Sequence, residues 1–520
     1  MKRAMVRTGV TILFTIALFA TLFCGCDAIN DVPPFIQNVT PTKGTAGTQV
    51  TITGSDFGFV PGDNTVRFNG KAGLIISANP YEIQVLVPQS AGTGKVTVQT
   101  EAGTTEGPEF KYLDPHTITS VEPLAGTAGA EVTITGENFD DLPGGTTVRF
   151  NGTVANVKSL TTTQIVVLVP ETAGSGKITV KTAAGTIDGP VFEYIYSSVV
   201  TTYAGDGTQG FANGPALEAK FNFPSGLVFD QSDNLYVCDR DINLIRRVDV
   251  NTGLVSTHVG SGSSTSTDGN GSSASFARPD GITIDVEGNL LVTEFLSGNI
   301  RKVTPGLDVI TLAGNGISGY ANGIGSAAQF NAPYGIVINA QGIIFVGDVG
   351  NTRIRRVTPE GDASTLAGNN DIDHIDGTGA AASFKSPYGL VVDQIGDIVI
   401  TDGNVLRKVT LEGVVTTIAG SDAGGFTNGP LESAEFKGMR GITRWRNDSF
   451  IIADMENNVI RMITPSGTVI TIAGDGTAGY QNGNGPAAKF NGPYSIAVNS
   501  KNEIFVGERD NHVIRKLVLK

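Results

Sequence analysis

The sequence predicts an all-β protein in which two small β-sandwiches precede a six-bladed β-propeller. Two internal repeats of different length, and one strand-like segment that lies ahead of the longer repeat, lead to this prediction. The longer repeat fills residues 198–520 and occurs six times at regular intervals of roughly 50 residues, a spacing typical of propeller or solenoid arrays. The shorter repeat covers residues 33–113 and 116–196, and its two copies align without insertion or deletion.

Residues 1–25 are a predicted export signal. Basic residues at the start precede an apolar run from Val10 to Phe23, which is too short for a comfortable membrane span. The segment resembles a bacterial lipoprotein signal, in which a small residue precedes the cysteine that is lipidated. Gly25 before Cys26 fits that pattern.

The resemblance implies that Cys26 is lipidated and that residues 26–32 form a linker to the first sandwich. Acyl chains on Cys26 would hold the exported protein at a bacterial membrane, in the outer membrane or at the cell surface. Phe23 before Cys24 departs from the lipoprotein pattern, so plain secretion is the alternative.

The bulk composition indicates a folded, multidomain protein. The chain has 520 residues, 40% hydrophobic residues and 68 glycines, which is enough apolar material for several cores. The formal net charge of -14 argues against a nucleic-acid partner, because a phosphate backbone needs a basic surface. Beyond Cys24 and Cys26 the chain contains one further cysteine, Cys238, so no disulfide between folded parts is expected.

Each copy of the shorter repeat is a predicted immunoglobulin-like sandwich. Short runs of alternating apolar and polar residues are separated by Gly and Pro turns over about 80 residues, which is typical of this fold. The aromatic residues Phe57, Phe68 and Phe139 are expected in the cores. The landmarks of the first copy and their counterparts in the second are Pro41 with Pro123, Gly44 with Gly126, Gly54 with Gly136, Phe68 with Phe150, Pro88 with Pro170, and Phe110 with Phe192.

The same segments resemble a known family. The strings VTPTKGTAGTQVTITGSDFG, from Val39 to Gly58, and VEPLAGTAGAEVTITGENF, from Val121 to Phe139, resemble IPT/TIG domains. This resemblance implies spacer or interaction modules of extracellular proteins. Neither copy contains a cluster of His, Cys or acidic residues suited to catalysis or to metal binding.

Four short strand-like runs occur in each copy of the longer repeat, which predicts one propeller blade per copy. In the third copy the runs are 335–338, 343–346, 353–357 and 363–367. The sixth copy ends at its third run, Val513 to Leu519, and lacks a fourth. The segment from Val199 to Ala204 has the character of that missing strand, so we expect it to close the ring and remove two sheet edges.

The repeat also resembles a propeller family. Its motif, seen best at Pro279 to Val303 and Pro493 to Leu517, is similar to that of NHL repeats. The resemblance implies the propeller fold but leaves the function open, because NHL propellers bind proteins, glycans or RNA, and related six-bladed propellers include enzymes.

A connection of about 20 residues, long for a compact domain, joins each outer strand to the next inner strand, and three sets of repeated residues are expected to hold it. Asp239 with Asn243, and Asp348 with Asn351, should satisfy turn backbone groups. One Phe in each connection should pack between blades, and one Arg in each third strand should form hydrogen bonds between blades. The Phe residues are Phe221, Phe276, Phe330, Phe384, Phe436 and Phe490. The Arg residues are Arg246, Arg301, Arg355, Arg407, Arg461 and Arg515.

A ligand is expected at positions that vary between blades on the face that carries the long connections. The residue after the repeat's Pro varies in this way, and we expect these residues to ring the mouth of the central channel, in an amphipathic rim suited to a sugar or a peptide. The alternative is that they simply cap the inner strands. The six candidates are Ser225, Asp280, Tyr334, Tyr388, Arg440 and Tyr494.

Blades four and five depart most from the repeat. Blade four is shortened at Asp402-Gly403-Asn404, and blade five reads Lys437-Gly438-Met439-Arg440 where others have Asn-x-Pro-x. Blade five also holds the single Trp of the chain, Trp445. Its register places Trp445 on the opposite face, where it is a second, weaker ligand-binding candidate.

An enzymatic alternative rests on related propellers that use metal-bound acids and His near the axis. No two of the four histidines share a repeat position. The acidic stretch from Asn369 to Asp376 lacks the spacing of a calcium loop, so a solvated loop is expected there. The histidines are His116, His258, His374 and His512.

The sequence therefore predicts a non-catalytic binding protein without catalytic residues, metal or cofactor. Two sandwich domains would present a propeller that captures a glycan or an envelope or extracellular protein. The sequence does not decide between these two ligands. The alternative is a metal-dependent hydrolase or lyase built on the same propeller.

Overall fold

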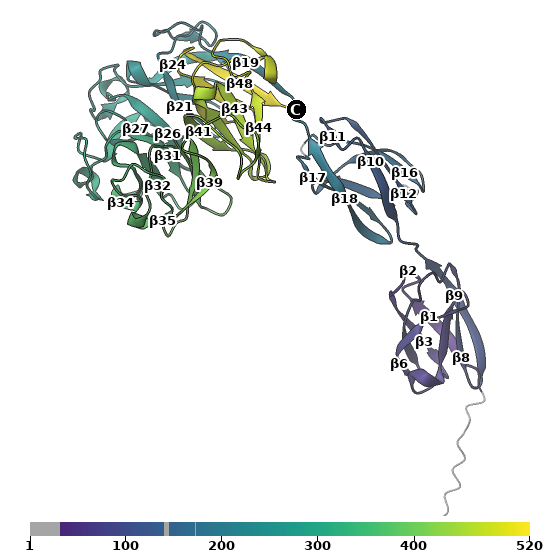
Figure 1. Cartoon of the computed structure of the whole chain (residues 1–520). Helices are drawn as coiled ribbons and strands as arrows, with labels where there is room; N and C mark the ends of the chain where they lie inside the picture. The colour runs from purple at the N-terminus through teal and green to yellow at the C-terminus, as the bar shows by residue number, and fades with distance from the viewer. Residues whose placement is uncertain (1–31, 140–144, 172) are drawn as a thin grey trace, which may run out of the picture. The chain divides into compact units, whose positions relative to one another are not determined.

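The computed structural model describes residues 32–139, 145–171 and 173–520 (Figure 1). These residues form 48 β-strands, and all of their helical segments are 3-10 turns of three residues, so the prediction of an all-β protein is confirmed. Cys26 and the export signal lie outside the described residues. The 3-10 turns are η1 (Pro61–Asp63), η2 (Arg240–Ile242), η3 (Gly271–Ser273), η4 (Gly325–Ala327), η5 (Val349–Asn351), η6 (Gly379–Ala381), η7 (Arg446–Asp448), η8 (Met455–Asn457) and η9 (Gly485–Ala487).

The first sandwich packs a four-stranded sheet against a five-stranded sheet. Alternate residues of each strand point inward, as in β3, where Val50 and Ile52 are fully buried, because side chains of a strand alternate between its two faces. Phe68 and Phe110 meet edge to face in the core, with ring centroids 5.1 Å apart. The sheets are β1 (Phe35–Thr40), β3 (Gln49–Ser55), β7 (Glu82–Leu86) and β6 (Leu74–Asn79), and β2 (Lys43–Gly44), β9 (Gly103–Tyr112), β8 (Gly94–Thr100), β4 (Thr65–Phe68) and β5 (Lys71–Ala72).

The second sandwich repeats this topology strand for strand. Phe150 and Phe192, which correspond to Phe68 and Phe110, again meet edge to face at 4.9 Å. The predicted core positions of Phe57 and Phe139 are confirmed, since each is 2% exposed. The sheets are β10 (Thr117–Glu122), β12 (Glu131–Glu137), β16 (Gln164–Leu168) and β15 (Asn156–Leu160), and β11 (Ala125–Gly126), β18 (Gly185–Tyr194), β17 (Gly176–Thr182), β13 (Thr147–Phe150) and β14 (Thr153–Val154).

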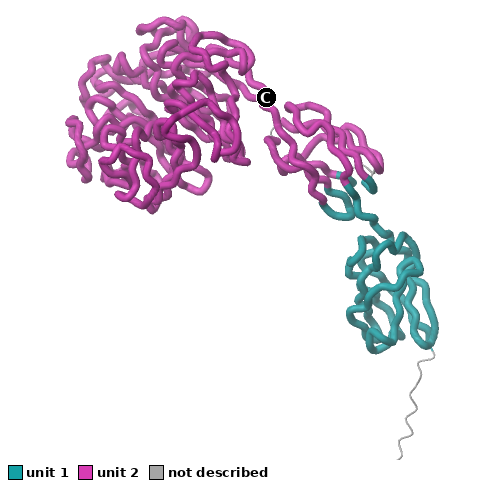
Figure 2. The backbone as a smooth tube through the Cα atoms, viewed as in Figure 1, with its two compact units in different colours: residues 1–117, 137–146, 181–186 teal, residues 118–136, 147–180, 187–520 magenta. Residues whose placement is uncertain are grey.

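By its internal contacts the chain divides into two compact units (Figure 2). One unit holds the first sandwich and two segments of the second, residues 137–146 and 181–186. The other holds the rest of the second sandwich and the propeller, residues 118–136, 147–180 and 187–520.

Six five-stranded sheets form the propeller, and we number these blades one to six along the chain. Each blade has the four expected antiparallel strands, and the long connection adds a two-residue strand that pairs with the outermost one, as Gly214 pairs with Val255. This fifth strand was not predicted. In order from the axis, with the added strand last, the blades are: one, β21 (Pro224–Phe229), β22 (Leu235–Asp239), β23 (Leu244–Val248), β24 (Leu254–Val259) and β20 (Gly214–Pro215); two, β26 (Pro279–Ile284), β27 (Leu290–Glu294), β28 (Ile300–Val303), β29 (Asp308–Ala313) and β25 (Gly269–Asn270); three, β31 (Pro333–Ile338), β32 (Ile344–Asp348), β33 (Arg353–Val357), β34 (Asp362–Ala367) and β30 (Gly323–Ile324); four, β36 (Pro387–Val392), β37 (Ile398–Asp402), β38 (Val405–Val409), β39 (Val414–Gly420) and β35 (Gly377–Thr378); five, β41 (Met439–Arg444), β42 (Phe450–Asp454), β43 (Val459–Ile463), β44 (Thr468–Ala473) and β40 (Gly429–Pro430); six, β46 (Pro493–Val498), β47 (Ile504–Glu508), β48 (Val513–Leu519), β19 (Ser198–Ala204) and β45 (Gly483–Asn484).

The ring closes as the sequence predicts, because β19 supplies the outer strand of blade six. It pairs antiparallel with β48, with Val200 opposite Leu517, and Figure 1 shows the two strands side by side near the C-terminus. Reciprocal backbone hydrogen bonds between Ser197 and Lys520, at 3.1 and 2.8 Å, extend this pairing to the last residue. Segments from the two ends of the propeller sequence thus complete one sheet.

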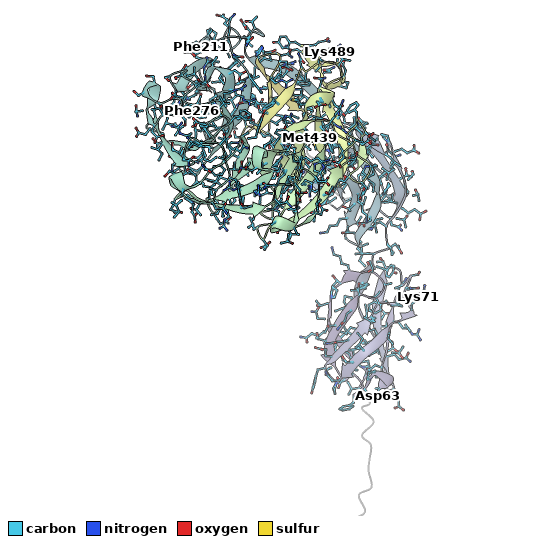
Figure 3. All side chains as sticks on the ribbon, turned by 60° about the vertical axis from the view of Figure 1, so that its left-hand side comes forward. Asp63, Lys71, Phe211, Phe276, Met439 and Lys489 are labelled. Carbon is cyan, nitrogen blue, oxygen red and sulfur yellow. The ribbon has the colours of Figure 1, made fainter. Side chains whose placement is uncertain are left out.

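Apolar side chains from each pair of neighbouring blades form a separate core cluster, and these clusters fill the disc (Figure 3). Phe276, labelled in Figure 3, packs with Cys238 and Ile245 of blade one and with Leu290 and Val292 of blade two. The predicted role of the repeated Phe residues as apolar anchors between blades is therefore confirmed. No described residue belongs to a helix long and apolar enough to cross a bilayer.

Candidate ligand-binding site

The repeated arginines hold each long connection against its own blade. Arg355 illustrates the arrangement: Nη1 donates to Asp348 Oδ2 at 2.8 Å and to the Gln329 carbonyl at 2.9 Å, while Nη2 donates to the Ala321 carbonyl and Asn322 Oδ1 at 2.8 and 2.9 Å. All six arginines are fully buried, and all six pair with the acidic residue that ends the second strand of their own blade. These acids are Asp239, Glu294, Asp348, Asp402, Asp454 and Glu508.

The prediction that these arginines form hydrogen bonds between blades is wrong, because their partners lie in the blade's own sheet and in the connection that enters it. Asparagines after the second strand link neighbouring blades instead. Asn243 Oδ1 of blade one accepts a hydrogen bond from the Arg278 amide of blade two at 3.0 Å. Asn404 Oδ1 of blade four accepts one from the Gly438 amide of blade five at 2.8 Å.

At the axis, the residue after the repeat's Pro lines the channel in every blade. The structure brings all six predicted site residues together around a cavity with a volume of about 110 Å³. They differ in burial. Ser225, Asp280 and Tyr494 are 4%, 2% and 6% exposed, whereas Tyr334, Tyr388 and Arg440 are half-buried.

Neighbouring inner strands approach closely below this ring, and a glycine follows the ring residue in five of the six blades. At Gly335 an added Cβ would lie 2.1 Å from the Tyr388 carbonyl oxygen of blade four. Ser495 replaces the glycine in blade six, and its buried hydroxyl has no hydrogen-bond partner among the described residues.

Gly335→Ala is therefore expected to destabilise the propeller by about 2 to 4 kcal/mol, because backbone must move to admit the methyl group. Urea unfolding followed by Trp445 fluorescence measures this. The control is Gly306→Ala, where the nearest atoms to an added Cβ are 3.6 Å or more away and a change below about 0.5 kcal/mol is expected. Equal effects of the two substitutions would contradict the close approach of the inner strands.

An arginine and aromatic rings fill one side of the mouth. Arg240 Nε pairs with Asp280 Oδ2 at 2.9 Å, and both side chains are almost fully buried. The guanidinium carbon of Arg240 lies 4.8 Å from the ring centroid of Phe223, 4.7 Å from that of Phe295 and 5.5 Å from that of Tyr334. These are cation–π distances, so Asp280 and its arginine form a closed unit whose charges are paired internally.

Aromatic rings also meet across the axis. Tyr334 of blade three and Tyr494 of blade six have ring centroids 6.4 Å apart, and Phe223 contacts Tyr494 edge to face at 4.8 Å. Met455 packs into the same cluster. The mouth is thus filled by side chains where the sequence predicts an open rim.

The two remaining candidates form the accessible part of the ring. The guanidinium of Arg440 stacks on Tyr388 with its carbon 3.8 Å from the ring centroid. Its two hydrogen bonds both leave from Nη1 and go to the backbone carbonyls of Gly438 and Met439, at 3.5 and 3.1 Å. Tyr388 in turn contacts Tyr334 edge to face at 5.0 Å.

Burial shifts the ionisation of the groups that lie deepest in the mouth. Burial raises the pKa of Asp280 to about 6, although the guanidinium groups of Arg240, Arg278 and Arg440 act in the opposite direction. Burial also raises the pKa of Tyr494 well above its usual value, so this hydroxyl stays protonated. The Tyr494 hydroxyl makes no hydrogen bond of acceptable geometry with any described residue.

Sequence reasoning missed half of the mouth, including Arg240, Phe223, Phe295 and Met455. These residues come from two further columns of the repeat that also vary between blades. One column follows the acid of the second strand, and the other precedes the repeat's Pro. The first reads Arg240, Phe295, Val349, Gly403, Met455 and Arg509, and the second reads Phe223, Arg278, Ala332, Ser386, Gly438 and Gly492.

In blade four His374 replaces a missing turn residue. Elsewhere an asparagine of the turn bonds the buried acid, as Asn351 bonds Asp348 at 2.8 Å. In the shortened turn of blade four, His374 reaches in from the connection, with Nε2 3.0 Å from the Asp402 carbonyl oxygen and Nδ1 bonded to Asp422. The surrounding carboxylates raise its pKa against the opposing effect of burial. His374 thus has a positioning role away from the channel.

Trp445 lies at the turn between the first two strands of blade five, on the face that its register predicts. Its Nε1 donates to the Asn502 carbonyl at 3.0 Å, and its ring packs against the core between blades five and six and against Tyr196. These contacts explain its presence without a ligand. Among the described residues, no group of three or more His, Cys, Asp or Glu side chains is arranged to hold a metal ion.

A larger cavity of about 960 Å³ opens on the face opposite the mouth, among the turns between first and second strands. Its carboxylates mostly cap their own turns. Asp230 Oδ1 accepts the Asn234 amide at 2.9 Å, and Asp285 Oδ1 accepts the Asn289 amide at 2.7 Å. The mouth is the stronger candidate despite its smaller volume, because it combines a half-buried, unpaired cation with buried hydroxyls that lack partners.

Comparison with known proteins agrees with the fold. Residues 34–112 and 116–194 match the IPT/TIG domain, which confirms that resemblance. A solved Bacteroides thetaiotaomicron protein of unknown function superposes with a TM-score of 0.52 at 19% sequence identity, over 78% of this chain and 98% of that one. At this identity the likeness shows the fold alone.

Two curated relatives share part of the sequence. SUPPRESSOR OF QUENCHING 1, a chloroplastic protein of Arabidopsis thaliana, is 26% identical over 277 residues, which cover 49% of this chain and 26% of that protein. Human Fibrocystin-L is 32% identical over 171 residues, which cover 31% of this chain and 4% of that protein. The chain therefore spans about a quarter or less of the length of these relatives.

Proposed function

We propose that this chain is an exported, membrane-anchored, non-catalytic binding protein whose propeller captures a glycan or a protein at the mouth of its channel. The observation that carries the proposal is the composition of the mouth. Tyr388 and Arg440 are half-buried and stacked on each other, while Tyr494 and Ser495 below them keep buried hydroxyls without partners. A buried polar group without a partner costs about 1 to 3 kcal/mol, which a polar ligand can offset.

The variable composition of the mouth supports recognition as its role. The buried acids, arginines and Phe residues repeat in nearly every blade and serve the fold. The side chains at the mouth differ from blade to blade, so the mouth offers a chemically asymmetric surface that one ligand can match in one orientation.

The remaining parts of the chain fit this proposal. Lipidation at Cys26 would tether the protein to the bacterial cell envelope, in the outer membrane or at the cell surface. The two IPT/TIG domains would act as spacer or interaction modules between the anchor and the propeller. The propeller itself would belong to the NHL-repeat family.

A binding screen with matched variants tests the proposal. The purified chain is applied to a glycan array and, separately, used to co-purify envelope proteins. Tyr388→Ala is expected to weaken the ligand found in either screen at least tenfold, because it removes the ring on which Arg440 stacks and opens the mouth.

The control for this screen is Val286→Ala on the opposite face, where Val286 is 79% exposed. It is expected to leave affinity unchanged. A ligand whose affinity, measured by calorimetry, is the same for Tyr388→Ala and the unsubstituted chain would remove the mouth as the binding site.

A further inference from the structure

Four arginines surround the aromatic side chains of the mouth, and three of them have carboxylate partners within the chain. Arg240 pairs with Asp280 at 2.9 Å, Arg278 with Asp241 at 2.8 Å, and Arg509 with Asp510 at 2.7 Å. The fourth is Arg440, and no described carboxylate lies within ion-pair distance of it.

The backbone and Tyr388 fix the Arg440 guanidinium without neutralising it. Its stack on Tyr388 and its two bonds to backbone carbonyls hold the plane in place. Neutral carbonyl acceptors leave the full positive charge, and the side chain remains half-exposed. A pre-oriented guanidinium of this kind favours the two oxygens of a carboxylate, because two parallel hydrogen bonds match the geometry of both groups.

The size of the channel restricts what can enter beside Arg440. Its volume of about 110 Å³ is far below the ~300 Å³ at which pockets for whole small molecules begin, and it corresponds to about four water molecules. An amino-acid side chain fits a space of this size, whereas a sugar ring with its hydroxyl groups needs more room. One face of Tyr388 is also covered by Arg440 and is closed to a stacking sugar.

The channel itself offers hydrogen bonds to such a group. The hydroxyls of Tyr494 and Ser495 line the same cavity, are buried, and lack partners within the described residues. A carboxylate accepts hydrogen bonds at both oxygens, so an acidic side chain could bond a hydroxyl as well as the guanidinium.

We infer that the ligand of the mouth is a protein that presents a peptide carboxylate to Arg440. This inference rests on the proposed function and narrows its ligand from a glycan or a protein to an acidic peptide segment. The charged contact explains why Arg440, alone among the four arginines, keeps no internal partner.

Selection of peptides on the purified full-length chain tests the inference. The probe is a displayed library of random seven-residue peptides, used in one form with a free C-terminus and in one form closed into a loop. Enriched peptides are expected to carry Asp or Glu at one fixed position, or a free C-terminal carboxylate, and to bind more weakly as NaCl concentration rises.

Arg440→Gln then separates this contact from the rest of the mouth. It is expected to weaken the selected peptides about tenfold to a hundredfold, as loss of a charge-assisted pair does. The control is Arg278→Gln, which removes an arginine of the same face that is already paired with Asp241 and should change affinity less than threefold. Replacement of the peptide's acid by its amide should reproduce the loss on the unsubstituted chain and have no further effect on Arg440→Gln.

The outcomes distinguish this inference from the proposed function. Peptides without an acidic preference, or with unchanged affinity for Arg440→Gln, would overturn the carboxylate contact, and the mouth would remain the binding site if Tyr388→Ala still abolished binding. Binding of an acidic polysaccharide such as polygalacturonate, lost in Arg440→Gln, together with failure to enrich any peptide, would overturn the choice of a protein. Peptides that bind equally well to Tyr388→Ala and to Arg440→Gln would overturn both proposals.

Discussion

Val200→Asp is expected to open the propeller ring and to cost at least about 4 kcal/mol of its stability. Val200 is fully buried in β19 and packs in the core between blades five and six with Leu517 and Ile472. An aspartate there places an unpaired carboxylate in an apolar cluster, which is among the most destabilising single changes. Because β19 is the strand that closes blade six, its release also exposes the edge of β48.

The neighbouring residue provides the control. Val199 lies on the same strand but is 36% exposed, because successive side chains of a strand point to opposite faces. Val199→Asp should cost less than about 1 kcal/mol. The two variants have the same charge and nearly the same position, so the difference between them isolates closure of the ring.

Trp445 makes the measurement direct. It is the single tryptophan of the chain and packs against the same cluster as Val200, so its fluorescence reports on this blade interface while the sandwich domains remain silent. Urea titrations that gave equal midpoints for Val199→Asp and Val200→Asp would show that the ring does not depend on β19.

Periodic features of the fold could be predicted from the sequence. The Phe in each connection recurs at a fixed place between Gly-rich turns, and a large apolar residue in a polar segment has to find a core. Closure by β19 could be predicted as well, because the last repeat lacks one strand and the segment before the first repeat has the right pattern. Both conclusions follow from counting along the chain, and the structure confirms both.

The partners of the repeated arginines could not be predicted in the same way. The sequence places Arg355 at a regular distance from Asp348 and Gln329, but the same distances recur in every blade. Spacing therefore cannot tell whether an arginine reaches its own connection or that of the next blade. The two-residue strand Gly214–Pro215 was missed for a different reason, since Gly and Pro have low strand propensity and only the outer strand beside them gives them partners.

The mouth was predicted in part. The varied position after the repeat's Pro identifies the side chains that line the channel, but variation alone does not say which remain exposed. Asp280 is removed from the surface by Arg240, a residue of another blade and another column of the repeat. Such convergence depends on the radius of the ring and on side-chain length, neither of which is visible in sequence spacing.

Arg246→Met is expected to destabilise the propeller by about 3 to 5 kcal/mol at pH 8, because it leaves the buried Asp239 carboxylate without its partner. Arg246 Nη1 donates to Asp239 Oδ2 at 2.8 Å and to the Lys220 carbonyl at 3.1 Å, and both charged side chains are 0% exposed. Met keeps most of the packing volume, so the loss reports chiefly on the charge and its hydrogen bonds.

The adjacent residue is a matched control. Arg247 also pairs with an aspartate, Asp249, at 2.9 Å, but the two side chains are 31% and 23% exposed. Pairs that solvent reaches contribute about 0 to 1 kcal/mol, so Arg247→Met should cost little. If Arg247→Met proved as destabilising as Arg246→Met, the contribution of burial to the cost would be refuted.

The cost of Arg246→Met should also depend on pH, and the direction follows from Asp239. Burial raises the pKa of Asp239 to about 7, even though the Asn222 amide and Arg246 favour its charged form. The folded chain therefore binds the Asp239 proton more tightly than the unfolded chain, in which the pKa is near 3.9, and stability gains from this group as pH falls from about 7 toward 4.

Removing the guanidinium raises the pKa of Asp239 further, which steepens the fall in stability above pH 7. At pH 5 the carboxyl is protonated in both proteins, and the variant loses only the hydrogen bonds that Arg246 makes to the connection. The penalty measured by urea unfolding should therefore be larger at pH 8 than at pH 5, and Asp239→Asn in the variant background should recover part of it at pH 8 alone. A penalty that stayed constant from pH 5 to pH 8 would mean that Asp239 does not change its protonation over this range, and that the arginines stabilise the connections by hydrogen bonding without a contribution from charge.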